Sequence, residues 1–214
     1  MVIAREFEPS RIGAKLREER EKRNISLREL ARRVGVSPSL ISQIELDRVN
    51  PSVSTLWSIV TELGMTMSEV FGETPDASEQ TATSREADRV VASPETRRVI
   101  NLASGVRWER LTPHNDPDVE FLYVVYPVGG ESSPEHALVT HGGREYGYVS
   151  SGTLGVQVGF DEYVLGPGAS IAFDSSAPHR LRTIGSEPVH AIWVVIGRVG
   201  DPRSEVESNL RSVE

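Results

Sequence analysis

The sequence predicts two domains of different fold class, an all-α domain followed by an all-β domain. Up to residue 72, apolar residues recur with the three- and four-residue spacing of helices, and capping residues separate the segments. From residue 90, short runs of β-branched and aromatic residues alternate with Gly, Pro, Asp and Ser, as in antiparallel strands. Between them lies a segment of neither period, rich in Ser, Thr and acidic side chains, which predicts a linker. The predicted segments are residues 1–72, the linker 73–89, residues 90–198 and a polar tail 199–214.

Residues 26–46 carry the strongest helical signals. One apolar face at helical spacing comprises Leu27, Leu30, Ala31 and Val34. Ser26 is a good N-cap, and Glu29 three residues later completes the pattern of a capping box. Gly35 predicts the end of this helix, because glycine adopts the left-handed C-cap conformation without strain. A second helix then begins with Ser37 as N-cap and Pro38 at its first position, so the segment has the helix-turn-helix layout.

The outer face of this second helix suits the reading of DNA bases. It presents Ser39, Ser42 and Gln43 in place of the Lys and Glu that are usual on a solvated face. Gln can bond adenine bidentately in the major groove, Ser can bond several bases, and Leu40 can pack on a thymine methyl group. The alternative is two surface helices of an ordinary small bundle. We favour DNA binding because turn chemistry, helix length and face composition agree.

Residues 11–71 resemble the phage-repressor, or xenobiotic-response-element, type of helix-turn-helix. The resemblance lies in the run SLRELARRVGVSPSLISQIE, in Asn50-Pro51 and in the later TLWSIVTELGM. It implies a domain of five helices in which Ser37–Leu46 is the recognition helix, with a double-stranded DNA operator as partner.

The resemblance also implies roles for individual residues. The positions matching Ser39 and Gln43 contact base edges in that family, and the position matching Ser37 lies near phosphate. Arg20 and Glu45 match a pair of oppositely charged residues, which predicts a structural ion pair; the alternative is two separate surface charges. The predicted DNA-binding residues are Ser37, Pro38, Ser39, Leu40, Ser42, Gln43, Arg28 and Arg48.

The charge distribution agrees with a DNA-binding first domain. The formal net charge is −8, but residues 1–72 hold 11 Lys or Arg and 10 Asp or Glu, and the remainder holds 12 and 21. The acidic second domain should be repelled by DNA, so only modest non-specific affinity is expected. The chain has no cysteine, no apolar run long enough to span a bilayer and no signal-peptide core at its N-terminus, which fits a cytoplasmic protein.

The second half of the chain predicts a sandwich or barrel of antiparallel strands. The candidate strands are RRVINL, VRWERL, VEFLYVVYP, HALVTH, EYGYVS, TLGVQV, YVLG, SIAFD, HRLRTI and VHAIWVVIG. Gly-containing turns near Gly152 and Gly159 are expected to close hairpins.

Three potential metal ligands lie at suggestive spacing in this half: His141, Glu145 and His179. The segments around them, HGGREYGYVSSG and GPGASIAFDSSAPHRLR, resemble the two motifs of the cupin superfamily, a double-stranded β-helix barrel, and the similarity covers roughly residues 98–198. It implies that the three residues match the second His, the Glu and the last His of the cupin metal site. Val139 stands at the position of the first His, so one ligand of four is lost.

Two readings of this ligand set remain open. Two His and one carboxylate can form a facial triad for Fe(II), and Zn²⁺ or Ni²⁺ is a further candidate. Alternatively, the barrel is a metal-free pocket in which His141 and His179 bond a ligand or Glu145. Strand alternation and side-chain chemistry suggest the effector-pocket residues Arg107, Tyr123, Tyr146, Tyr148 and Phe173.

Together these features predict a one-component transcription regulator. It would bind an operator as a homodimer and bind a small-molecule effector, with or without a metal, in its β-domain. An enzyme is the rival reading, because the ligand segment and the domain order also resemble a mononuclear non-haem iron epoxidase of the hydroxypropylphosphonate type. A third reading is a repressor without effector, in which the barrel serves only dimerisation.

Overall fold

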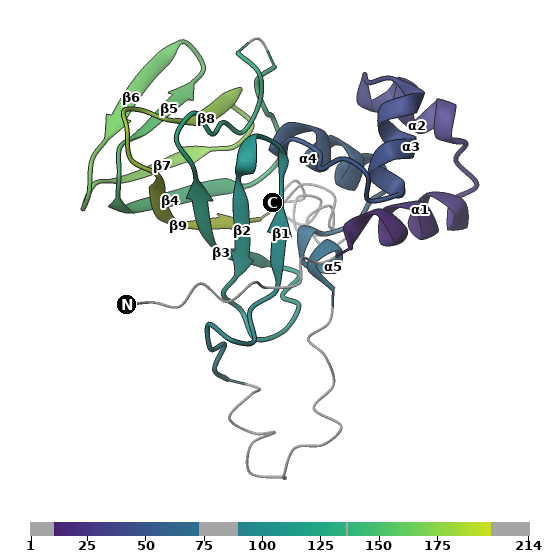
Figure 1. Ribbon diagram of the computed structural model, residues 1–214, viewed down its shortest axis with the longest axis horizontal. Coiled ribbons are helices and arrows are strands. Elements are labelled where there is room, and N and C mark those ends of the chain that lie inside the picture. Colours follow the sequence, from purple (N-terminus) through teal and green to yellow (C-terminus); the bar gives the residue numbers. More distant parts are fainter. Residues whose placement is uncertain (1–10, 73–89, 136, 198–214) are drawn as a thin grey trace, which may run out of the picture.

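The computed structural model describes residues 11–72, 90–135 and 137–197, and it confirms the two predicted fold classes. The predicted linker 73–89 and tail 199–214 lie outside these residues. In Figure 1 a group of helices lies beside a β-sandwich, with helices α4 and α5 next to the strands. We call residues 11–72 the helical domain and residues 90–197 the β-domain.

The helical domain contains five helices, as expected. They are α1 (Ile12–Lys22), α2 (Leu27–Val34), α3 (Pro38–Glu45), α4 (Val53–Glu62) and α5 (Met67–Phe71). The turn chemistry follows the sequence signals: the Ser26 and Ser37 hydroxyls each accept a hydrogen bond from the N–H three residues later, and Gly35 has φ of 75°. Only half of the predicted capping box forms at α2, because the Glu29 carboxylate bonds Arg32 and Arg33 instead. None of the described helices is long and apolar enough to cross a membrane.

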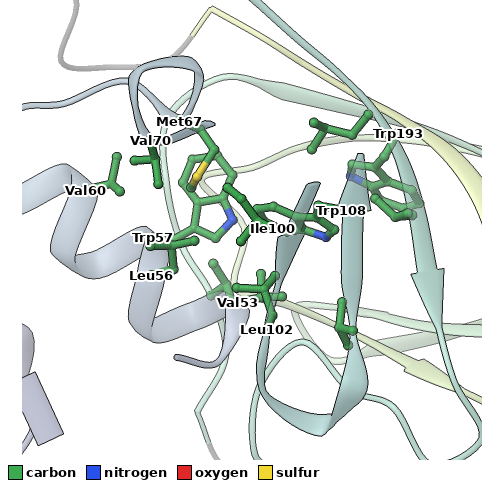
Figure 2. Close-up of a cluster of buried hydrophobic side chains, with 14 of the residues drawn as sticks. Val53, Leu56, Trp57, Val60, Met67, Val70, Ile100, Leu102, Trp108 and Trp193 are labelled. Carbon is green, nitrogen blue, oxygen red and sulfur yellow. The ribbon is translucent and has the colours of Figure 1, made fainter. Parts of the chain in front are cut away.

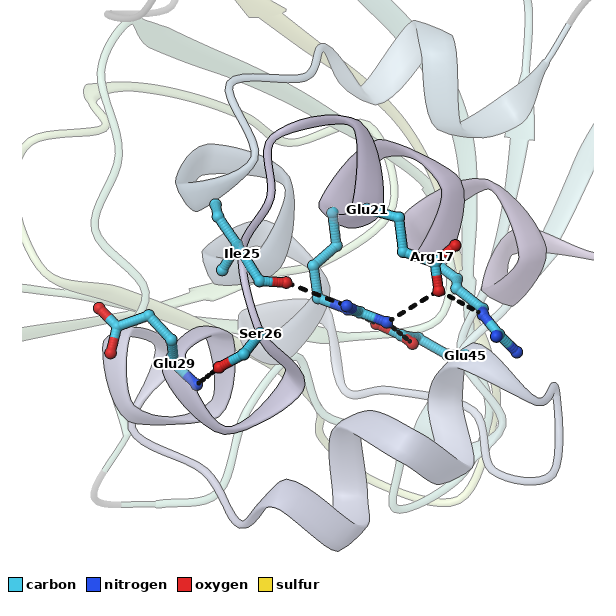
Figure 3. A network of polar contacts seen from close by, with 7 residues as sticks. Arg17, Glu21, Ile25, Ser26, Glu29 and Glu45 are labelled. Carbon is cyan, nitrogen blue, oxygen red and sulfur yellow. Dashed lines mark hydrogen bonds and ion pairs between the residues drawn. The ribbon is translucent and has the colours of Figure 1, made fainter.

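The recognition helix α3 is fixed to α1 by a buried ion pair. Arg20 donates from Nε to Glu45 Oε1 at 2.6 Å and from Nη2 to Oε2 at 2.8 Å, and Figure 3 shows this network. The same guanidinium donates to the carbonyl of Ile25 at 3.0 Å, just before α2. Because the guanidinium of Arg20, on α1, bonds both α3 and the loop before α2, it sets the angle of α3 relative to α1 and α2.

The β-domain consists of two antiparallel sheets. Six strands form the first in the order β1 (Val99–Asn101), β2 (Arg107–Arg110), β3 (Val119–Tyr126), β9 (Val189–Ile196), β4 (Arg144–Ser151) and β7 (Ser170–Asp174). The second has the order β6 (Asp161–Leu165), β5 (Leu154–Val158) and β8 (His179–Thr183). Their inner faces meet in a core of alternating apolar residues.

Two local expectations were wrong. The run HALVTH does not form a strand in its described part, because it makes only the single bridge between Val139 and His179. No hairpin closes at Gly152, since β4 and β5 belong to different sheets and the chain crosses between them there. The hairpin at Gly159 does form, between β5 and β6.

The two domains share one apolar core. Buried residues of α4 continue into β1 and β2, and Figure 2 shows Val53 and Trp57 facing Ile100, Leu102 and Trp108. Hydrogen bonds also connect α4 and the residues just before it to the β-domain. The Ser54 N–H donates to the Ser132 carbonyl at 3.1 Å, and the Ala103 N–H donates to the Pro51 carbonyl at 2.8 Å.

Helix α5 and the residue that follows it also form hydrogen bonds with the β-domain. Arg110, on β2, donates from Nη1 to the carbonyl of Gly72 at 2.9 Å, directly after α5. The Asp116 N–H donates to the hydroxyl of Ser68 at 3.1 Å. Helix-end groups that lack intrahelical partners are thus bonded by the β-domain, so the junction is specific in its polar as well as its apolar contacts.

Candidate functional site

The exposed face of α3 carries the predicted base-reading side chains. Ser39 and Gln43 are exposed, whereas Leu40 and Ser42 are half-buried. On the opposite face, Ile41 and Ile44 enter the core. The Ser37 hydroxyl is engaged as N-cap, accepting from the Leu40 N–H at 3.2 Å, and Pro38 occupies the first turn. The helix therefore presents a short polar ridge to solvent.

Basic side chains border this ridge. Arg28 and Arg48 are exposed, and neither forms an ion pair with a carboxylate of the described residues. Arg32 and Arg33 differ, because both bond Glu29 and hold the pKa of that carboxyl at about 2. Arg28 and Arg48 are accordingly the better candidates for phosphate contacts.

A second cluster, in the β-domain, brings together His141, Glu145 and His179. One ligand atom from each lies within 4.8 Å of the others. Glu145 comes from β4, His179 begins β8, and His141 lies in the segment before β4. The backbone N–H of His141 donates to the Ser175 carbonyl at 3.1 Å. Both imidazole Nε2 atoms are 3.0 Å from Glu145 Oε1.

The hydrogen bonds of the two imidazoles fix their tautomers. Nδ1 of His141 is 2.9 Å from the Gly142 carbonyl, and Nδ1 of His179 is 2.9 Å from the Ala177 carbonyl. A carbonyl only accepts, so each Nδ1 must carry a proton, and the neutral ring presents the lone pair of Nε2 to the cluster. Glu145 Oε1 is buried and receives no hydrogen bond of good geometry. Three electron-rich atoms therefore face one point.

This arrangement requires positive charge. Burial opposes ionisation of Glu145, but imidazoles that carry a proton on Nε2 donate to the carboxylate, outweigh burial and hold the pKa of that carboxyl below its ordinary value. Burial likewise lowers the basicity of His179, yet the Glu145 carboxylate outweighs it and raises the pKa of that imidazole. Protons can supply the charge, and so can a divalent cation that displaces them. The donor set fits a facial triad for Fe(II), or Zn²⁺ completed by water.

The carboxylate is oriented from behind by an indole. Trp193 Nε1 donates to Glu145 Oε2 at 2.6 Å. The indole reaches this position because it lies over Gly147, where a Cβ would be only 2.1 Å from the Trp193 ring. With Oε2 occupied by Trp193, only Oε1 is directed at the two imidazoles, which is the outer hydrogen bonding expected around a metal ligand.

A cavity of about 30 Å³ adjoins the cluster. All three tryptophans of the chain line it, Trp108 and Trp193 from the β-domain and Trp57 from α4. Aliphatic side chains of β3, β8 and β9 complete the wall, and Ser132 adds a polar group. One ordered water needs about 10–15 Å³ of such space, so the cavity has room for an ion together with water.

Both domains match known protein families. Residues 16–70 match the helix-turn-helix family, and residues 122–195 match the cupin domain family. The chain joins a helix-turn-helix domain to a cupin domain. The HTH-type transcriptional regulator PuuR of Escherichia coli is 27% identical over 168 residues, which are 78% of this chain and 84% of PuuR.

Two solved structures add to this comparison. A transcriptional regulator from Vibrio cholerae aligns over 88% of this chain and 96% of its own, with a TM-score of 0.59 and 25% identity. The hydroxypropylphosphonic acid epoxidase from S. wedmorenis aligns over 87% of this chain and 97% of its own, with a TM-score of 0.43 and 19% identity. The second similarity is too low to assign a reaction.

The cupin cavity is not lined by the five side chains proposed from the sequence. Tyr146 and Tyr148 are 41% and 49% exposed on the outer face of β4. Arg107 pairs with Glu109, and the Tyr123 hydroxyl bonds His190 Nδ1 at 2.7 Å. Phe173 is buried, but it lies behind His179, with the ring centroids 5.1 Å apart. The face of β3 that lines the cavity does not carry Tyr123; it carries Leu122, Val124 and Tyr126.

Trp57 belongs to the cavity wall, although it lies on a helix of the other domain. Its ring stacks on His141 with centroids 4.3 Å apart and planes inclined by 14°. It also contacts Trp108 edge to face at 6.2 Å. In an isolated helical domain, a tryptophan on the apolar stripe of a helix is expected to lie in that domain's core. Only the packing of the two domains reveals its contact with His141.

We expect Trp193→Phe to lower the affinity of the cupin domain for Zn²⁺ about 10- to 100-fold, because it removes the indole N–H that orients Glu145. Calorimetric titration of the full chain with Zn²⁺ at fixed pH measures the change. Tyr146→Phe is the matched control, since it alters an aromatic side chain on the outer face of β4 and should leave the affinity unchanged. Wild-type affinity in Trp193→Phe would contradict the assigned role.

Proposed function

We propose that the protein is a one-component transcription regulator that binds its operator as a homodimer through α3 and responds to the occupancy of its cupin cavity. The observation that carries this proposal is the union, in one chain, of an exposed polar recognition helix with a pocket lined by three convergent ligand residues. DNA binding by the helix-turn-helix domain is the best supported part, because the domain pair and the relatives that span both domains agree.

In this proposal α3 enters the major groove. Gln43 would bond a base edge and Ser39 would bond a neighbouring one, because these are its most exposed short polar side chains. Arg28 and Arg48 would neutralise phosphates on either side. The buried pair of Arg20 and Glu45 would keep α3 at a constant angle during binding.

In the cupin domain, His141, Glu145 and His179 would hold a divalent ion. A bound ion would act as a Lewis acid that anchors an oxygen or nitrogen of an effector. The protein's own part is to fix the ligand directions: two backbone carbonyls hold the imidazoles and Trp193 holds the carboxylate. The apolar walls would exclude water from the rest of the pocket.

The outer face of the six-stranded sheet supports a homodimer. Phe121, Tyr146, Tyr148 and Ile196 are 38%, 41%, 49% and 43% exposed there. The strand register makes them neighbours, since Val194 of β9 lies opposite both Phe121 and Tyr146. Contiguous exposed aromatic and aliphatic side chains on a sheet mark an interaction surface. A second copy is the fitting partner, because two recognition helices are needed to bind half-sites about 34 Å apart.

An iron-dependent oxygenase is the second candidate, and the facial ligand set favours it. We place it second because the curated relatives that span both domains are transcriptional regulators.

We expect Gln43→Ala to weaken operator binding by about 1–3 kcal/mol and to relax base preference at the contacted position, because one bidentate base contact is lost. Arg48→Ala should instead weaken all duplexes alike and reduce the slope of log K against log salt by about 1. Fluorescence anisotropy with operator and scrambled duplexes over a salt series measures both. An unchanged base preference in Gln43→Ala would rule out the base-reading role.

Tyr148→Glu is expected to shift the protein from dimer to monomer, because it places a charge within the proposed interface. Sedimentation velocity measures the shift, with at least a tenfold weaker self-association expected for a buried interface aromatic. Phe160→Glu is the control: Phe160 is fully exposed at the β5–β6 turn, outside the six-stranded sheet. If both variants remain dimers, this face is not the interface.

A further inference from the structure

The wall of the cupin cavity includes part of the DNA-binding domain. Trp57 and Val53, both on α4, line the cavity together with the three candidate ligands. Trp57 is only 5% exposed although it belongs to a different domain from the rest of the wall. The cavity is therefore complete only while α4 is docked.

Trp57 lies directly on one of the candidate ligands. Its indole stacks on the imidazole of His141 at 4.3 Å between centroids and 14° between planes. The plane of His141 thus determines the plane on which Trp57 rests. Coordination of an ion constrains that plane, because Nε2 must then point at the ion.

A second contact connects the cavity to the same helix. Ser132 lines the cavity, and its carbonyl accepts the hydrogen bond of the Ser54 N–H at 3.1 Å in the first turn of α4. Its hydroxyl accepts from the Leu181 N–H at 2.9 Å, on the strand that begins with His179. A change in the position of β8 would therefore also reach α4.

The other face of α4 belongs to the core of the DNA-binding domain. Leu56 and Val60 are fully buried there with Leu30 of α2 and Ile44 of α3. Close-packed cores shift as units and do not deform continuously. A displacement of α4 is therefore expected to move α2 and the recognition helix with it.

We infer that Trp57 couples the occupancy of the cupin cavity to the position of the recognition helix. An ion that binds His141, Glu145 and His179 fixes the plane of the imidazole on which Trp57 stacks, and an organic occupant of the cavity would contact Trp57 in its wall. Occupancy thereby favours one placement of α4 over another. The inference rests on the proposed function, and it specifies the residue through which that function is regulated.

The test uses the full chain, Zn²⁺ alone as the occupant and the duplex that the metal-free protein selects from a randomised pool. Calorimetry gives the Zn²⁺ affinity, and fluorescence anisotropy gives the DNA affinity with and without Zn²⁺. We expect Zn²⁺ to change the DNA affinity of the wild type at least about fivefold, the lower end of typical allosteric coupling. In Trp57→Ala, which keeps all three ligands, the change should fall below about twofold while Zn²⁺ still binds.

Two further variants separate coupling from mere destabilisation. Trp57→Phe retains a ring to stack on His141 and should restore most of the Zn²⁺ effect. Leu154→Ala truncates a buried residue of the cupin core that does not line the cavity, and it should leave the Zn²⁺ effect on DNA affinity intact.

The outcomes are distinguishable. Equal Zn²⁺ effects in wild type and Trp57→Ala, or bound Zn²⁺ without any effect on wild-type DNA affinity, would overturn the role of Trp57 and leave the regulator assignment standing. Failure of the wild type to select any duplex, both metal-free and with Zn²⁺, would contradict the regulator assignment itself. Absence of Zn²⁺ binding in the calorimeter would contradict the metal centre and the inference with it.

Discussion

The stack of Trp57 on His141 is the contact on which the organisation of this protein depends. Because Trp57 is buried among cupin residues, the DNA-binding domain cannot leave the cupin domain without opening its cavity. Because His141 is also a candidate ligand, the same contact connects the chemistry of the cavity to α4. The hydrogen bond from Ser54 to Ser132 and the bond from Arg110 to Gly72 then hold this helix and α5 in register with the strands.

The candidate metal ligands and the recognition helix are each held in position by other residues that would contact neither the metal nor the DNA. Two backbone carbonyls and Trp193 aim the imidazoles and the carboxylate, and Gly147 leaves the space that Trp193 needs. In the helical domain the guanidinium of Arg20 holds α3 through Glu45 in the same manner. Rigid support of this kind is what lets a small change at one site be transmitted to the other as a movement of whole helices.

Local signals in the sequence predicted much of this structure. Ser26, Gly35, Ser37 and Pro38 determine caps and a turn within a few residues, so the helix-turn-helix was predictable, and the spacing of His141, Glu145 and His179 within two motifs predicted their convergence. The pocket was not predictable, because β3 is apolar on both faces and alternation alone cannot tell Phe121, Tyr123 and Val125 from Leu122, Val124 and Tyr126. The role of Trp57 depends on how two domains dock, and no local pattern encodes that.

Amide hydrogen exchange at Ser54 tests the shared cavity most directly. This N–H is in the first turn of α4, where no intrahelical acceptor exists, and its partner is the carbonyl of Ser132 in the cupin domain. We predict that it exchanges about as slowly as amides in the middle of β3, measured by NMR on the full chain. Exchange at the rate of an unprotected amide, while α4 and β3 amides remain protected, would show that the domains separate freely and would contradict the account.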